Sequence, residues 1–214
     1  MDNLCNLAQR YIHIKDVSNL VNFDLLQLEV AGLKFKSNNN NLISENMNLL
    51  DREVFNDFKH GLELECINYL NNTLGIGQLY QGLKITNSWA NLTRPGESHH
   101  EHTHPFSIVS GVIFLDNNPD NLNLFVEGYM PEIPYFFSKQ KSYVGLKHLF
   151  ENIGIEPSSV NNLQNHMVLF LSNSHHFVES TSNVSPDRKT ISFNTFWKGQ
   201  VGVQQESLGS YNFG

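Results

Sequence analysis

The chain has 214 residues, of which 40% are hydrophobic, enough to bury a substantial core. Its net charge of −7 argues against a nucleic-acid backbone as the main partner, because phosphate binding requires a clustered surplus of Lys and Arg; a nucleotide or a flipped base is not excluded. No apolar run approaches the ~20 residues of a membrane span, and the N-terminus has no hydrophobic signal segment, so we expect a cytoplasmic protein.

Residues 1–77 predict short strands and one supporting helix. The apolar alternation in 25–35 predicts a strand or a hairpin, and the SNNNN run at 37–41 predicts a loop. A helix is predicted from Asp51, as its cap, up to Gly75. Seven apolar residues recur there at helical spacing, and their face must pack on a sheet: Val54, Phe55, Phe58, Leu62, Leu64, Ile67 and Leu70.

From residue 78 the hydrophobic period changes from helical to β. Many short strands without helices between them favour a sandwich or barrel over an α/β sheet. Residues 129–165, with a predicted short helix at 141–154, form an excursion of the kind that often makes lids or substrate loops. We expect one mainly β (α+β) domain over 1–214, with its core at 78–200. The predicted strands are 78–93, 105–115, 122–128, 166–172, 175–182 and 188–197.

Six of the ten histidines lie in two short stretches, residues 99–104 and 175–176. His102 and His104 are separated by one residue, and alternate side chains of a strand share a face, so both imidazoles can point into one cavity. Imidazole binds Fe, Zn, Cu and Ni, so this spacing alone identifies no metal. A solvated, His-rich loop also explains it.

The second histidine stretch favours a metal site. Two ligands on one strand and a third, His176, on a distant strand match the facial triad of non-haem Fe(II) oxygenases, which leaves positions open for cosubstrate and O₂. A 2-oxoglutarate site also needs a buried cation, preferably a guanidinium, for the far carboxylate. Arg188 opens the next predicted strand and can supply it, and Thr190 on the same face adds a hydroxyl donor.

Two ordered blocks carry a resemblance to a known family. SWANLTRPGESHHEHTHPFSIVSGVIFL (88–115) and LFLSNSHHFVES (169–180) with DRKTISFNTF (187–196) resemble a family of 2-oxoglutarate/Fe(II)-dependent oxygenases known from marine bacteria and their phages. The resemblance covers roughly residues 85–200. It implies a double-stranded β-helix (jelly-roll) with the N-terminal helix packed on the outer sheet, and Fe(II), 2-oxoglutarate and O₂ as the reaction's requirements.

A more distant similarity to prolyl 4-hydroxylases implies a cosubstrate contact for Thr93, just before the Pro95-Gly96 turn. If that strand is regular, Trp89 and Asn91 share a face with Thr93 and can line the substrate end of the barrel. Ser107, Ser110 and Asn194 are weaker candidates for the same lining. The implied substrate is a small molecule or a protein side chain.

The chain departs from the common pattern where a carboxylate ligand is usual, since His104 stands there. The rival His99-x-Glu101 has the His-x-carboxylate spacing, but the register with Pro105 favours the His102/His104 pair. His175 competes with His176 as the third ligand, and the spacing to Val178 favours His176. Leu171 replaces a proline of the family pattern.

Two other functions compete with an oxygenase. Gly96, five residues and then His102-x-His104 fit the opening of the first cupin motif, which implies a metal-binding β-barrel independent of 2-oxoglutarate. The glutamate of that motif is missing, because Ile108 and Val109 stand in its place, and the second cupin motif is not found. A noncatalytic jelly-roll binding module is the other alternative.

Overall fold

The computed structural model describes residues 12–73, 82–118, 121, 123–127, 143–147, 163–179, 186–201 and 211–213. Two helices, several single turns and thirteen strands are defined within these ranges. The helical elements are α2 (Phe23–Ala31), the 3-10 turns η2 (Leu49–Asp51) and η3 (Glu53–Phe55), α3 (Asn56–Asn68) and the π-helical turn η4 (Tyr69–Thr73). The strands are β1 (His13–Asp16), β2 (Phe35–Asn38), β3 (Asn41–Ser44), β4 (Leu83–Thr93), β5 (His99–His102), β6 (Val109–Phe114), β7 (Leu124–Glu127), β8 (Tyr143–Gly145), β9 (His166–Leu171), β10 (His176–Val178), β11 (Arg188–Trp197), β12 (Gly199–Val201) and β13 (Tyr211–Phe213).

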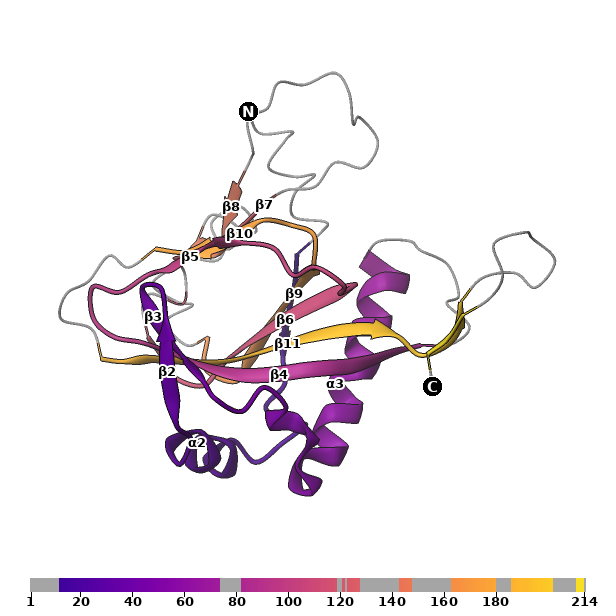
Figure 1. Cartoon of the computed structure of the whole chain (residues 1–214), viewed down its shortest axis with the longest axis horizontal. Helices are drawn as coiled ribbons and strands as arrows, with labels where there is room; N and C mark the ends of the chain where they lie inside the picture. Colours follow the sequence, from indigo (N-terminus) through magenta and orange to yellow (C-terminus); the bar gives the residue numbers. More distant parts are fainter. Residues whose placement is uncertain are drawn as a thin grey trace, which may run out of the picture.

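Two antiparallel sheets form the core of the molecule. The larger has seven strands in the order β1-β9-β6-β11-β4-β3-β2, and the smaller has four in the order β5-β10-β7-β8. Figure 1 shows β5, β7, β8 and β10 grouped on one side of β4, β6, β9 and β11. This pair of sheets is the predicted double-stranded β-helix. β12 and β13 form a separate two-stranded ribbon.

Strand β11 shows how the sequence divides the two faces of the larger sheet. Ile191 and Phe193 point to the outer face and join the core beneath the helices. The alternate residues Arg188, Thr190 and Ser192 point the other way and line a pocket between the sheets. The strand thus buries apolar side chains on one face and aims polar ones at the interior.

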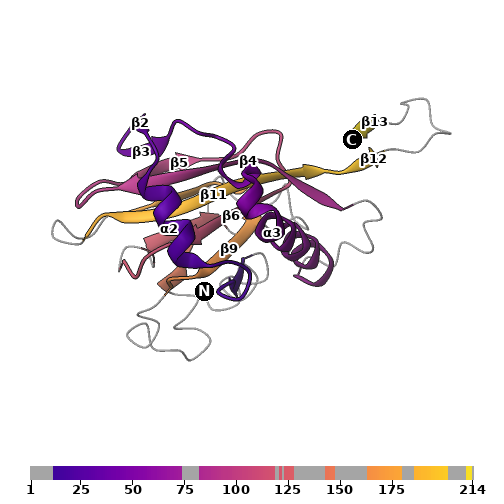
Figure 2. The ribbon, with the colours of Figure 1, turned by 90° about the horizontal axis from the view of Figure 1, so that it is seen from below.

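The helices cover the outer face of the seven-stranded sheet (Figure 2), as predicted for α3 but not for α2, which the sequence analysis did not predict as a helix. Leu26 of α2 and Phe58 and Leu62 of α3 share one buried cluster with Ile191 and Phe193. A second apolar cluster lies on the inner side of that sheet: Ile12, Val112, Phe114, Leu124, Val126, Leu146, Leu163, Val168, Phe170 and Val178.

The strand or hairpin predicted for 25–35 is wrong over most of its length, because Phe23–Ala31 is helical. Asn22 caps α2 by accepting the backbone N–H groups of Asp24 and Leu25. Leu28 is 70% exposed, so the apolar alternation at 25–35 does not mark one buried face.

The loop predicted for SNNNN is a tight hairpin turn. Ser37 and Asn38 end β2 and Asn41 begins β3, which leaves two residues for the turn itself. Asn39 takes a positive φ of 54°, a conformation that Asn tolerates better than most residues. The turn-forming residues were therefore recognised, but not the strands on either side.

The predicted helix begins later than expected. Asp51 ends the η2 turn instead of capping α3, and its carboxylate accepts from Lys59 Nζ at 2.5 Å. Phe55 occupies the N-cap position without a side-chain hydrogen bond. Leu62 is buried as predicted, whereas Val54 and Leu64 are exposed, contrary to the prediction. Gly75 lies outside the described residues.

The excursion at 129–165 falls largely outside the described residues. Its predicted helix at 141–154 is wrong for Tyr143–Gly145, which form β8 and pair with Phe125–Glu127 of β7. His166 begins β9, as predicted. Among the helices that the structure describes, none is both long and apolar enough to cross a membrane.

Candidate metal centre

Three histidines from two segments of the small sheet meet inside the molecule. His102 ends β5 and lies directly opposite His176 of β10 in the strand register. His104 follows β5, and its backbone N–H donates to the Ser172 carbonyl at 2.9 Å, which holds the chain beside the turn before β10. The potential ligand nitrogens of His102, His104 and His176 all lie within 4.8 Å of one another.

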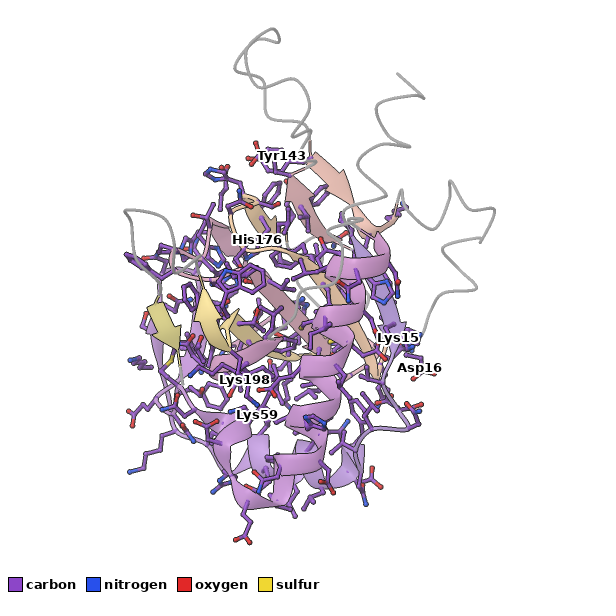
Figure 3. All side chains as sticks on the ribbon, turned by 90° about the vertical axis from the view of Figure 1, so that its right-hand side faces the viewer. Lys15, Asp16, Lys59, Tyr143, His176 and Lys198 are labelled. Carbon is purple, nitrogen blue, oxygen red and sulfur yellow. The ribbon has the colours of Figure 1, made fainter. Side chains whose placement is uncertain are left out.

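His176 is the buried member of this cluster, and His102 and His104 are half-buried. His176 is 5% exposed, and Figure 3 shows its side chain among those packed between the strands, whereas Lys15 and Asp16 lie at the surface. The His176 ring contacts the rings of Phe170, His102 and His104. Its Nδ1 lies 3.1 Å from the Ser174 carbonyl, which fixes the orientation of the ring.

Burial keeps these imidazoles neutral. Loss of hydration lowers the pKa of His104 to about 4, with repulsion from His102 as the second cause. The same loss of hydration, followed by repulsion from His102 and His104, holds the pKa of His176 well below its ordinary value. Burial also lowers the pKa of His102. Neutral imidazole is the form that binds a metal, so the lone pairs stay available through neutral pH.

The spacing of the His104 and His176 nitrogens fits a common metal ion. The Nε2 atoms of His104 and His176 are 3.1 Å apart. Two imidazole nitrogens at about 2.1 Å from one ion and at right angles to each other lie about 3 Å apart. A set of three nitrogen ligands suits Fe(II), so the residues present fit the iron that a facial triad would hold.

The rival ligands lie outside this cluster. Glu101 pairs with His175, with 2.9 Å between Oε1 and Nδ1, and both side chains are more than a third exposed. The His175 backbone N–H also donates to Glu127 Oε2 at 3.2 Å. His99 lies nearer, because its ring stacks on His102 with 4.6 Å between centroids, and it lines the same pocket.

Arg188 lines the same pocket as the histidines and is 3% exposed. Its Nε donates to Asn121 Oδ1 at 2.8 Å, and its guanidinium lies 5.6 Å from the centre of the Phe114 ring. These contacts from two other segments fix the cation between the sheets. Thr190 also lines the pocket, two residues along β11.

Two buried polar atoms on β4, the strand next to Arg188, have no hydrogen-bond partner among the described residues. Thr93 pairs with Arg188 across β4 and β11, and its Oγ1 has no hydrogen-bond partner within the described part of the chain. The same holds for Oδ1 of Asn91, whose Nδ2 donates to the hydroxyls of Thr190 and Ser192 at 3.3 and 2.9 Å. Because an unpaired buried polar atom costs free energy, Oδ1 of Asn91, which lines the pocket, fits a polar ligand there.

The two predicted substrate-end residues lie in the pocket wall. Trp89 and Asn91 both line it, two residues apart on β4. The Trp89 ring lies 5.6 Å from that of His104. Thr93 is buried on the same strand but is not part of the lining.

The sequence analysis did not identify some residues of the pocket lining, nor Asn121, which lies outside the lining and contacts Arg188. Ser192 continues the alternation of Arg188 and Thr190, so strand periodicity could have identified it. Asn121 reaches Arg188 from outside the strands, and no local pattern marks it. The apolar part of the lining is Val112, Leu124, Phe177 and Val178.

A family model described as "Putative 2OG-Fe(II) oxygenase" matches residues 87–194, just over half of the chain. This range contains all three clustered histidines and Arg188. No curated protein matches the sequence.

Solved structures of low sequence identity share the fold. An oxidoreductase of the 2OG-Fe(II) oxygenase family from Burkholderia pseudomallei matches with a TM-score of 0.53 at 9% identity, covering 90% of this chain and 89% of that one. HygX from Streptomyces hygroscopicus, with nickel and 2-oxoglutarate bound, gives 0.55 at 8% identity, with 91% and 86% covered. SnoN, an α-ketoglutarate-dependent epimerase of nogalamycin biosynthesis, gives 0.58 at 8% identity, with 97% and 87% covered.

Proposed function

Since the chain belongs to the 2OG-Fe(II) oxygenase family, we propose that it hydroxylates a small molecule or a protein side chain with release of succinate and CO₂. The observation that carries the proposal is the buried Arg188 in the same pocket as His102, His104 and His176. That pocket combines a nitrogen ligand set with a cation for a dicarboxylate.

We assign His102, His104 and His176 as the metal ligands. When bound, Fe(II) activates O₂ with electrons from 2-oxoglutarate, so that one oxygen atom enters the substrate and the other enters succinate. A neutral set of three imidazoles leaves the charge of the ion uncompensated. Binding of a dianion beside it compensates this charge, so we expect metal and 2-oxoglutarate to strengthen each other's binding.

Arg188, Thr190 and Thr93 form the proposed far end of the cosubstrate site. The guanidinium donates to a carboxylate in a fork geometry, and burial strengthens this interaction because little water competes. Thr190 adds a hydroxyl donor from the same strand. Thr93 lies opposite Arg188 on β4, and its Oγ1 has no partner within the described ranges, which supports its place in this set.

Trp89 and Asn91 are the proposed substrate-end residues. The indole lies against His104 and covers one side of the histidine cluster. Together with the apolar lining, it keeps bulk water away from the reacting atoms. Asn91 lies in the same wall, and its Oδ1 has no partner in the part of the chain that the structure describes.

Anaerobic titration tests the assignment. Adding Fe(II) and 2-oxoglutarate to the metal-free protein should produce a metal-to-ligand charge-transfer absorption. Arg188→Ala should weaken 2-oxoglutarate binding by at least 10-fold, because it removes the only cation proposed for that carboxylate, while leaving Fe(II) binding in place. Arg94→Ala, at an exposed turn, is the matched control and should change neither.

Absence of the absorption band from the wild-type protein would refute the assignment. Metal binding without any affinity for 2-oxoglutarate would favour the cupin alternative. For the substrate, mass spectrometry of candidate pools should find a gain of one oxygen atom in step with succinate release.

A further inference from the structure

His104 has a polar neighbour behind it that leads into a chain of buried hydroxyls. Nδ2 of Asn194 lies 3.2 Å from Nδ1 of His104, on the side of the ring away from His176. Oδ1 of Asn194 lies 2.8 Å from Ser110 Oγ. Asn194 therefore contacts the histidine that stands where a carboxylate ligand is usual.

The hydroxyl chain runs from Asn194 to the backbone. Ser110 Oγ lies 2.8 Å from Ser172 Oγ, and Ser172 Oγ lies 2.7 Å from Ser107 Oγ. Ser107 Oγ lies 3.0 Å from the Thr195 carbonyl oxygen. Ser110 and Ser172 are essentially fully buried, so water does not supply missing partners to them.

Counting the hydrogens along this chain fixes its direction. Four contacts link the Asn194 amide, the three serine hydroxyls and the Thr195 carbonyl, and each contact needs one hydrogen. Three hydroxyls supply three hydrogens, and a carbonyl supplies none. In the structure Ser110 Oγ donates to Oδ1 of Asn194, which leaves the Ser110–Ser172 contact without a hydrogen. All four contacts become hydrogen bonds when the amide is turned, so that Nδ2 of Asn194 donates to Ser110.

The direction of the chain determines the proton position on His104. Rotating the Asn194 amide by half a turn swaps the positions of Nδ2 and Oδ1 and needs almost no extra space. Nδ2 then faces Ser110, and Oδ1 faces Nδ1 of His104. An amide oxygen accepts only, so Nδ1 carries the proton and donates it. The lone pair of the ring then lies on Nε2, the atom 3.1 Å from Nε2 of His176.

We propose that Asn194 is a positioning residue for metal binding: its Oδ1 accepts the Nδ1 proton of His104, and the Ser110–Ser172–Ser107 chain holds the amide in that orientation. The inference rests on the proposed function, because it concerns a ligand of the same metal. In the opposite orientation Nδ1 accepts, the proton lies on Nε2, and His104 cannot bind a metal through that atom. Asn194 thus selects the tautomer that binds.

Co(II) binding to the metal-free protein tests the role without any turnover. Asn194→Leu keeps a similar volume but cannot accept a proton, and it should weaken Co(II) binding by roughly 10- to 100-fold, the usual effect of losing such a partner. Asn194→Asp keeps an acceptor and should retain or exceed the wild-type affinity. Asn87→Leu is the matched control, because Asn87 lies directly opposite Asn194 on β4, and it should bind like wild type.

A second measurement reads the tautomer directly in the wild-type chain. NMR of the Zn(II)-loaded protein with isotope-labelled histidine should show the His104 proton on Nδ1 and the metal on Nε2. A proton on Nε2 would overturn the inference. It would also be overturned if Asn194→Leu folded and bound Co(II) with wild-type affinity. Failure of the wild-type protein to bind Co(II) would instead overturn the proposed function together with this inference.

Discussion

His104 and His176 hold their Nε2 atoms 3.1 Å apart although 72 positions separate them in the chain. Burial opposes protonation of both rings, and repulsion between charged imidazoles at short distance adds to that resistance. The folded protein therefore holds two neutral imidazoles that the unfolded chain would protonate at mildly acidic pH.

We predict that the metal-free protein loses stability as the pH falls below about 6.5, the ordinary histidine pKa. The pKa of His104 is lowered to about 4, so between these values the unfolded chain binds more protons than the folded one. Stability then rises with pH across that window and is complete above it. Of this rise in the free energy of unfolding, His104 alone accounts for on the order of 3 kcal/mol.

Urea unfolding at a series of pH values between 4 and 8 measures how steeply the free energy of unfolding rises with pH. His104→Gln removes the titrating ring but keeps a polar side chain, so its slope should be flatter. A His104→Gln variant with the wild-type slope would show that other groups cause the pH dependence.

Replacement of neighbouring histidines separates the proposed ligand from its rival. His176→Ala should reduce Co(II) affinity by more than 100-fold, because it leaves two ligands from one segment. His175→Ala is the matched control, since the side chain lies one residue away, is partly exposed and pairs with Glu101. We expect its Co(II) affinity, measured by absorption titration, to stay near wild type. Equal losses in both variants would contradict the assignment of His176.

Much of the β core could be predicted from periodicity. The strand predicted at 188–197 has the bounds of β11, because apolar and polar residues alternate between a core face and a pocket face. The same alternation identified Thr190 as a neighbour of Arg188. Residues buried on one face of a long strand leave a local signal, and that signal is enough to place them.

The remaining features depend on long-range contacts. Asn121 contacts Arg188, and Glu101 contacts His175. Both contacts join residues far apart in the chain, so no local sequence pattern predicts them. The strand or hairpin predicted for residues 25–35 is wrong for another reason. Leu26, Leu28 and Val30 alternate as in a strand, but Leu28 is exposed and the segment is helical.

Two leucines of α3 test the corrected helix face. Leu62 is fully buried between the helix and the sheet, whereas Leu64 is 48% exposed. We expect Leu62→Ala to destabilise the fold by about 2–5 kcal/mol through lost burial and a cavity. Leu64→Ala should change the free energy of unfolding by less than about 0.5 kcal/mol, as measured by urea denaturation. Similar losses in the two variants would mean that α3 packs differently.

Gly111 of β6 lies directly opposite Phe193 of β11, and the Phe193 ring occupies the space where a side chain at 111 would begin. Gly111→Ala should therefore cost about 1–3 kcal/mol by overpacking. The cost should be smaller when Phe193→Leu is introduced as well, because the shorter side chain leaves room, and this coupling should reach at least ~0.5 kcal/mol in a double-mutant cycle.

Gly32→Ala provides the control for the glycine substitution itself. A Cβ at Gly32 meets only carbonyl oxygens at ordinary contact distances, 3.7 and 3.9 Å, and φ is −83°. This change should leave the protein as stable as wild type or slightly more so, since alanine restricts the unfolded chain.

Because Ser110 precedes Gly111 and belongs to the chain of hydroxyls behind His104, the strain of Gly111→Ala should also weaken Co(II) binding, while Gly32→Ala should not. A Gly111→Ala variant that is destabilised yet binds Co(II) normally would show that the two faces of β6 are independent.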